Sequence, residues 1–397
     1  KIVNAGIQSL PVALETYGPD GVWLEGPGYW HYATRYTGYG ISALETALGS
    51  DFNLTGIEGM RETGAFPIYT TGPTGLYLNF ADSGEWRKRN PMPVLFWLAD
   101  EYNSSFFANS EHRLLRTGHS EPEHVVWYQP QDFAETAQPD LDRVFEGDVD
   151  VAVFRSEWHN PEALFVGVKS GYNQVNHGHL DLGNFELDAL GVRWARDLGS
   201  DNYNLPNYWG KDEGAQRWDY YRLNSRSHNV PLINNDNQDV YATSDFLRHE
   251  TGVDEPFVIV DLTEAYEDYS TRTYRGVKMV RDRKAILVQD EFDLSQRSEV
   301  KWGMTTDAEI EIQNRHSAIL TIDDKTLQAT ILSPRRARFQ VESAEQEPPQ
   351  KKNIGVHRLI VDTGKKRRNL QISVLLAPVW STGETVTDLQ IEELENW

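Results

Sequence analysis

The sequence predicts an α+β protein in which a helical N-terminal part precedes a large antiparallel β-sandwich. Apolar residues recur at helical spacing in residues 1–120, whereas short apolar runs separated by Asp, Asn, Gly and Pro recur from Val125 onward. A polar stretch containing Gly118 and Pro122 separates the two patterns. We therefore expect one domain at 1–118, a second at 123–380, and a C-terminal strand or tail at 381–397.

Three helices are expected from apolar periodicity in the first part. They are Ile2–Glu15, in which Pro11 should kink or restart the helix, Ile41–Leu48, which Gly49 can cap, and Val94–Tyr102. Strands are expected at Val125–Tyr128, Val149–Phe154, Ala163–Val168, Phe257–Leu262, Ala285–Phe292, Ile319–Ile322, Gln328–Leu332, His357–Val361 and Gln371–Leu376.

The stretch Gly171–Phe185, GYNQVNHGHLDLGNF, places two histidines and an aspartate, all able to act in catalysis or metal binding, within five residues. In an extended strand His177, His179 and Asp181 would project on one face, because side chains alternate with a period of two. Such a pattern is compatible with solvated histidines on a polar face as well as with catalysis or metal binding.

Two downstream residues favour a metal site. Asp197 and His228 complete, with His179, a His, Asp, His set that suits Zn²⁺. We expect these ligands to come from adjacent strands of one sheet.

Aromatic residues mark two segments of the helical part. Glu25-Gly-Pro-Gly opens a helix that places tyrosines at 29, 32, 36 and 39 on one face. This face can be an aromatic core stripe or a sugar-binding wall with His31 and Arg35. In Phe66–Asp82, a turn at Gly72–Gly75 would present Tyr77 and Asn79.

The amino-acid composition limits the classes of partner that this protein is expected to bind. The net charge is −22, which argues against nucleic acid and against an anionic membrane surface, and solubility alone also explains the acidity. The chain has no cysteine, so disulfides and thiolate sites are excluded. No apolar run approaches a membrane span. Because Lys1 is not a start residue, we expect a mature or truncated form.

Together these pieces resemble the heparinase II/III-like polysaccharide lyases. The matching segments are VNAGIQSLPVAL at 3–14, DGVWLEGPGYWHYATRYTGYG at 20–40, GPTGLYLNFAD at 72–82, NHGHLDLGNF at 176–185, DLGSDNY at 197–203 and SRSHN at 225–229. The resemblance implies an α/α toroid, here incomplete and N-terminally truncated, followed by the sandwich. It also implies β-elimination on a uronic-acid-containing polysaccharide such as alginate or a glycosaminoglycan, in a secreted or periplasmic protein that can oligomerise.

The resemblance also implies roles for individual residues. His177 and Tyr77 match the catalytic acid–base pair, with Tyr208 as a second cleft tyrosine and Tyr203 as its fallback. The zinc bound by His179, Asp197 and His228 would be structural and would hold the segment that aims His177. The candidates for substrate contact are Glu25, His31, Arg35, Asn176 and Arg226, although Arg226 can equally pair with an acidic residue.

Two other functions fit the same residues. A non-catalytic carbohydrate-binding or assembly protein could use the sandwich and a structural zinc. A zinc hydrolase is less favoured, because no glutamate has the spacing of an HExxH site. The run Lys365–Arg368 (KKRR) is interpreted as a solvated turn between two strands.

Overall fold

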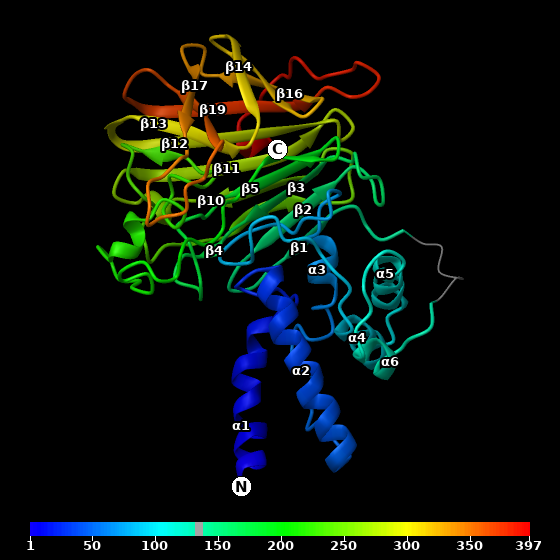
Figure 1. Ribbon diagram of the computed structural model, residues 1–397. Helices are drawn as coiled ribbons and strands as arrows, with labels where there is room; N and C mark the ends of the chain where they lie inside the picture. The colour runs from blue at the N-terminus through cyan, green and yellow to red at the C-terminus, as the bar shows by residue number, and fades with distance from the viewer. Residues whose placement is uncertain (132–137) are drawn as a thin grey trace.

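The computed structural model describes residues 1–131 and 138–397. Its α-helices all precede its strands, and Figure 1 shows them at one end of the molecule with the large sheets at the other. The α-helices are α1 (Ile2–Leu14), α2 (Pro27–Leu48), α3 (Ala65–Tyr69), α4 (Val94–Tyr102), α5 (Ser105–Leu115) and α6 (Glu123–Val126). Single 3-10 turns are η1 (Glu15–Tyr17), η2 (Gln216–Asp219), η3 (Glu264–Tyr266) and η4 (Leu394–Asn396).

The ends of α2 follow from its sequence. Pro27 occupies the first helical position, where a missing N–H costs nothing, after Gly26 at φ 84°. Gly49 ends the helix in the left-handed region at φ 73°, and its N–H bonds Glu45 O, as expected. In α1 the helix continues through Pro11 without restarting.

The strands are β1 (Arg143–Phe145), β2 (Val151–Arg155), β3 (Phe165–Lys169), β4 (Gly171–Tyr172), β5 (Phe185–Ala189), β6 (Val192–Ala195), β7 (Leu232–Ile233), β8 (Thr243–Ser244), β9 (Phe246–Glu250), β10 (Phe257–Asp261), β11 (Ser270–Val280), β12 (Ala285–Ser298), β13 (Val300–Thr306), β14 (Glu309–Asn314), β15 (Ser317–Ile322), β16 (Lys325–Ser333), β17 (Arg338–Ser343), β18 (His357–Asp362) and β19 (Arg367–Pro378). They pair antiparallel throughout.

The strands form three main sheets. Their orders are β1-β2-β3-β5-β6, β14-β15-β16-β19-β12-β11-β10-β9 and β17-β18-β13-β7, with a small β4-β8 ribbon. The predicted order of a helical part followed by an antiparallel sandwich is confirmed, and within the described residues the helical part supplies a partial toroid.

The five-stranded sheet lies between the two parts of the molecule. In β2, Ala152 and Phe154 pack into the sandwich core, while Val151 and Val153 pack against the helical part. Because both faces are covered, all five residues of β2 are buried. This explains why Val151–Phe154 is a continuous apolar run rather than an alternating pattern.

Two predicted strands are wrong. Val125 and Val126 form the exposed end of α6 instead, and the first strand among the described residues is β1, which begins at Arg143. The stretch Gly171–Phe185 is mostly turns between β4 and β5, so it is not one extended strand. The first prediction failed because it relied on the β-propensity of valine. The second failed because glycine and asparagine residues in this stretch form turns.

The C-terminal residues 381–397 form no strand and end in η4. Leu394 and Trp397 pack against Phe257 and Ile259 of β10, so this segment is anchored to the outer face of the eight-stranded sheet. Among the described residues, no helix combines the length and the apolar character needed to cross a membrane.

Candidate active site and metal centre

His177 stands at the surface within a group of hydrogen-bonded and stacked side chains. Its Nδ1 lies 2.6 Å from Asp82 Oδ2. The imidazole stacks on Tyr29 with ring centroids 4.9 Å apart, and Trp209 meets it edge-on at 5.2 Å. Its side chain is 19% exposed, so the group is fixed on several sides and still reachable from solvent.

The turn around His177 is tightly built. His177 has a positive φ of 57°, a conformation that non-glycine residues adopt only where the surroundings enforce it. At Gly178 a Cβ would come within 2.7 Å of Asn173 O and 2.9 Å of Val175 O. Glycine is therefore required beside the histidine, and the close packing of this turn sets the direction of the imidazole.

Asp82 links two histidines. Its side chain is fully buried, with Oδ2 bound to His177 and Oδ1 3.2 Å from His179 Nε2. Burial raises the pKa of this carboxyl, but the hydrogen bonds from His177 and His179 outweigh burial and hold it well below its ordinary value. Asp82 is therefore ionised and accepts Nδ1–H of His177, which leaves Nε2 of that ring free to take a proton.

Two tyrosine hydroxyls complete this group. Tyr203 donates to Asp82 Oδ2 at 2.9 Å, and its hydroxyl lies 3.4 Å from that of Tyr29. Burial first, then the hydrogen bond with Tyr29 and the charge of Asp82, raise the pKa of Tyr203 far above its ordinary value. Tyr203 therefore remains protonated and can only act as a proton donor near neutral pH.

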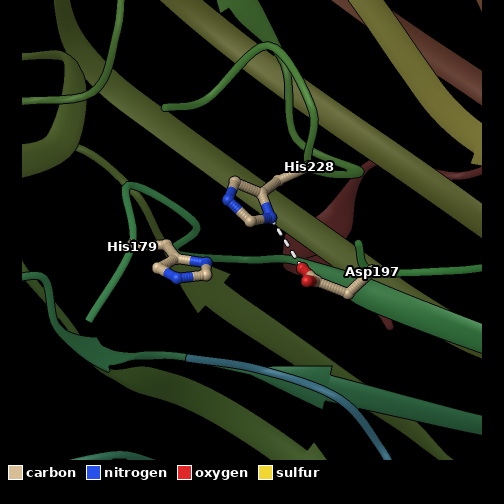
Figure 2. A group of neighbouring side chains, drawn as sticks. All are labelled: His179, Asp197 and His228. Carbon is tan, nitrogen blue, oxygen red and sulfur yellow. Dashed lines mark hydrogen bonds and ion pairs between the residues drawn. The ribbon is translucent and has the colours of Figure 1, made fainter. Parts of the chain in front are cut away.

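The three predicted metal ligands converge beneath this group. Figure 2 shows His179, Asp197 and His228 facing one another, and one ligand atom from each lies within 4.8 Å of the others. Asp197 lies two residues after the end of β6, while His179 and His228 lie in irregular segments outside the helices and strands. The expectation that three adjacent strands carry them is wrong, because none of the three residues lies in a strand.

The chemistry of this set fits a zinc ion. His179 Nδ1 and His228 Nε2 are buried with no hydrogen-bond partner among the described residues, although buried ring nitrogens are normally paired. Burial holds the pKa of His179 below its ordinary value, and for Asp197 the neighbouring His228 outweighs burial and lowers the pKa. A neutral imidazole and an ionised carboxylate are the forms that bind a metal.

The surroundings orient these ligands. Asn184 Nδ2 donates to Asp197 Oδ2 at 2.9 Å, and Glu186 Oε1 accepts the N–H of Asp197 at 2.8 Å. Burial raises the pKa of Glu186 to about 8, despite the nearby Arg193. Because Asp82 contacts both His177 and His179, the metal set and the exposed histidine form one connected network.

Two predicted tyrosines lie elsewhere. Tyr77 is 3% exposed in the helical core, and its hydroxyl faces Met92 Sδ at 3.8 Å. The turn at Gly72–Gly75 forms, but residues 76–80 after it are all buried, and Tyr77 is among them. Tyr208 is 1% exposed, its hydroxyl accepts the N–H of Asp201, and its ring packs behind Tyr203. The structure thus brings the fallback tyrosine, Tyr203, to His177.

The predicted substrate-contacting residues divide into two groups. Glu25 Oε1 lies 3.8 Å from His177 Nε2, and Asn176 is exposed next to that histidine. Arg35 instead pairs with Glu121 at 2.6 Å and Glu123 at 2.7 Å, joining α2 to α6.

The remaining two are His31 and Arg226. His31 is half-buried, and burial, aided by Arg87 and Arg35, lowers its pKa to about 4. Arg226 is exposed and donates to Asn235 O at 3.3 Å. Neither has a contact with His177 in the described part of the chain, so Glu25 and Asn176 are the candidates that the structure places at the site.

Two residues of the site carried no assigned role in the sequence. Asp82 lies at the end of the aromatic segment 66–82, and Trp209 lies in the loop after β6. Asp82 and its partner His177 are 95 residues apart in the sequence, so no local spacing predicts their contact. Tyr29 was visible only as one member of a tyrosine face, whose neighbours Tyr32 and Tyr36 are 64% and 57% exposed.

The structure thus defines a class of two-part proteins, in which a helical part joins an antiparallel β-sandwich and a histidine–tyrosine–aspartate group lies above a buried His, Asp, His set. A model of the family described as "Heparinase II/III-like, C-terminal" matches residues 151–385. The chain therefore belongs to the heparinase II/III-like family, as the resemblance in its motifs indicates.

Solved structures agree with this fold. Heparinase III superposes with a TM-score of 0.73 at 14% identity, over 94% of this chain and 57% of its own. A heparan sulfate lyase HepC mutant from Pedobacter heparinus gives 0.72 at 17%, over 94% and 55%. A chondroitin AC lyase mutant from Streptomyces coelicolor A3 gives 0.52 at 13%, over 91% and 54%.

The chain thus spans little more than half the length of these structures. The comparison with curated proteins found no match.

Proposed function

We propose that this protein is a polysaccharide lyase that cleaves a uronic-acid-containing polysaccharide by β-elimination. The observation that carries the proposal is the group formed by His177, Asp82 and Tyr203 at the surface of a chain from the heparinase II/III-like family. β-Elimination needs a base for the C5 proton of the uronate and an acid for the leaving glycosidic oxygen.

His177 is the proposed base. With Nδ1–H donated to Asp82, the free Nε2 can accept the C5 proton, and the ionised carboxylate stabilises the imidazolium that forms. The stacking of Tyr29 and the edge contact of Trp209 hold the ring in this direction. Aromatic faces of this kind also suit contact with sugar rings.

Tyr203 is the proposed acid. Its raised pKa keeps the phenol protonated, and Tyr29 lies within reach to return a proton through the 3.4 Å contact between the hydroxyls. The proton taken from C5 remains on His177, and the electron pair forms the C4–C5 double bond as the C4–O bond breaks. The leaving oxygen takes its proton from the phenol.

His179, Asp197 and His228 would hold a zinc ion, which supplies positive charge and a rigid anchor beneath the site. Through Asp82 these residues fix His177, which is a positioning role. The buried ring nitrogens without partners support this assignment.

The proposed substrates are glycosaminoglycans and alginate, and the proposed location is secreted or periplasmic. The names of the similar structures refer to heparan sulfate and chondroitin, which favours a glycosaminoglycan over alginate. We also propose that the protein can form oligomers, which a measurement of its mass in solution tests.

One observation favours the second candidate, a non-catalytic carbohydrate-binding protein. Glu25 places a carboxylate 3.8 Å from Nε2 of His177, where it would repel the carboxylate of a uronate. Among the described residues that contact His177, none is cationic, whereas an anionic substrate needs a partner that neutralises its charge.

The deciding experiment measures the ultraviolet absorbance of the unsaturated product on heparan sulfate, chondroitin sulfate, hyaluronan and alginate. Wild type is compared with His177→Ala and with His249→Ala, whose side chain is exposed on β9 far along the chain. We expect product with at least one polymer from wild type and His249→Ala only. Binding of a polymer without product from any variant would favour the second candidate.

A further inference from the structure

The run Lys365–Arg368 is not an isolated solvated turn. It does follow β18, as its sequence indicates, but β18 and β19 belong to different sheets and do not pair, so the run covers the connection between the two sheets and the start of β19. The fold, however, brings it beside two other basic segments. A hollow of about 280 Å³ is lined by Arg297, Arg336, Lys365, Lys366, Arg367, Arg368 and Asn369, and we call it the basic hollow.

Three separate segments build the basic hollow. Arg297 is near the end of β12, whose neighbour Ser298 pairs with Arg367 of β19. Arg336 lies in the connection between β16 and β17, and its carbonyl oxygen lies near Gly364 of the β18–β19 connection. The convergence depends on strand pairing and is invisible in the sequence.

The positive charges in the basic hollow are not neutralised by the protein. Across residues 1–131 and 138–397, none of its six cationic side chains forms an ion pair. Arg367 Nε is buried and has no hydrogen-bond partner among these residues. A buried donor without a partner is costly, so it points to an acceptor supplied from outside.

The nearby carboxylates are already engaged. Asp362 accepts from Arg338 at 3.0 Å and from Gln340 at 3.0 Å. Asp293 accepts from Arg272 at 2.7 Å and from Asn369 at 3.1 Å. In a chain of net charge −22, six unpaired cations in one hollow oppose the overall field and repel each other.

We propose that the basic hollow is a second binding site for an anionic polysaccharide, which it holds by carboxylate or sulfate groups. The identity of this ligand rests on the proposed lyase function, because that function supplies an anionic chain long enough to contact more than one site. Arginine and lysine side chains on a shallow surface suit such groups, and arginine can bind them with two parallel hydrogen bonds.

The site is separate from the group around His177. Its residues belong to β12, the β16–β17 connection, the β18–β19 connection and the start of β19, and none of them contacts His177, Asp82 or Tyr203 in the described part of the chain. It would therefore retain a long chain on the sandwich, and it would take no part in the elimination.

The test removes three exposed charges from the basic hollow in the variant Arg336→Gln, Lys366→Gln, Arg368→Gln. The matched control, Lys1→Gln, Arg116→Gln, Arg281→Gln, removes three exposed charges elsewhere and gives the same net charge. Both sets are also placed in a His177→Ala background, so that the polymer is not consumed. Binding of heparin and of alginate is measured by calorimetry at low and at high salt.

We expect the hollow variant to bind at least one polymer about tenfold more weakly than the control at low salt, with a smaller difference at high salt. With His177 intact, the hollow variant should raise KM for long chains while kcat and the KM for a tetrasaccharide stay unchanged. Equal binding by hollow variant and control would overturn the proposal.

Two further outcomes separate this proposal from the lyase function and from other ligands. If the hollow variant binds polysaccharide more weakly but wild type forms no unsaturated product, the second binding site is supported and the proposed lyase function is rejected. Phosphatidylserine vesicles and duplex DNA serve as other anions. If the substitutions weaken binding to either of these and leave both polysaccharides unaffected, the polysaccharide assignment is wrong.

Discussion

Replacing Asp82 with asparagine tests the network at its central residue. The two carboxylate oxygens bind His177, His179 and Tyr203. An asparagine has one oxygen and one NH₂ group, so it can no longer accept from both sides. If the NH₂ group faces His177, it donates to Nδ1 and forces the proton onto Nε2, the atom proposed as the base.

The magnitude follows from these contacts. The loss of one hydrogen bond to a buried charge costs about 1.5–3 kcal/mol in stability. Loss of the correct tautomer removes general-base catalysis, which contributes roughly 10²- to 10⁴-fold to a rate. We therefore expect kcat to fall by about 10²-fold or more, while the melting temperature falls by a few degrees.

The assay is initial-rate measurement of the unsaturated product, paired with thermal unfolding of each variant. Asp142→Asn is the control, because Asp142 is also buried and pairs with Arg283 at 2.6 Å, away from the site. It should lose stability and keep its kcat. An Asp82→Asn enzyme with kcat within threefold of wild type would show that Asp82 does not set the tautomer of His177.

Three more predictions use other parts of the structure. Tyr77→Phe should keep its activity because the Tyr77 hydroxyl faces Met92, whereas Tyr203→Phe should lose at least tenfold in kcat. If product assays give the reverse order, Tyr77 and not Tyr203 is the acid. Wild type should contain about one zinc per chain by elemental analysis, and chelation should lower its melting temperature. The variant His228→Ala should lack the metal, and its melting temperature should not respond to the chelator. An equal response of wild type and variant would argue against the metal site. His31 has a folded-state pKa of about 4 against about 6.5 unfolded, so its contribution to stability is complete above pH 6.5 and is lost as pH falls from 6.5 to 4. That contribution is about 3 kcal/mol. The melting temperature of His31→Gln should therefore depend less on pH in this window, and an unchanged pH slope would contradict the assignment.

The sequence determined the features that depend on local chemistry. Helical periodicity located Val94–Tyr102 to the residue, and Gly49 marked the end of α2 because a left-handed cap favours glycine. Apolar runs located most of the sandwich strands that were expected. The residue types of His179, Asp197 and His228 suit zinc, so the sequence proposed them as one set, and the structure brings one ligand atom of each within 4.8 Å of the others.

Tertiary structure alone decided the contacts between distant segments. Asp82 reaches His177 across 95 positions, Tyr203 and not Tyr77 lies beside His177, and Arg35 pairs with Glu121 and Glu123. The basic hollow likewise exists only because β12 and β19 pair and the β16–β17 connection lies beside them. Sequence periodicity records which face of an element is buried, but it does not record which other element covers that face, and that pairing is what assembles the site.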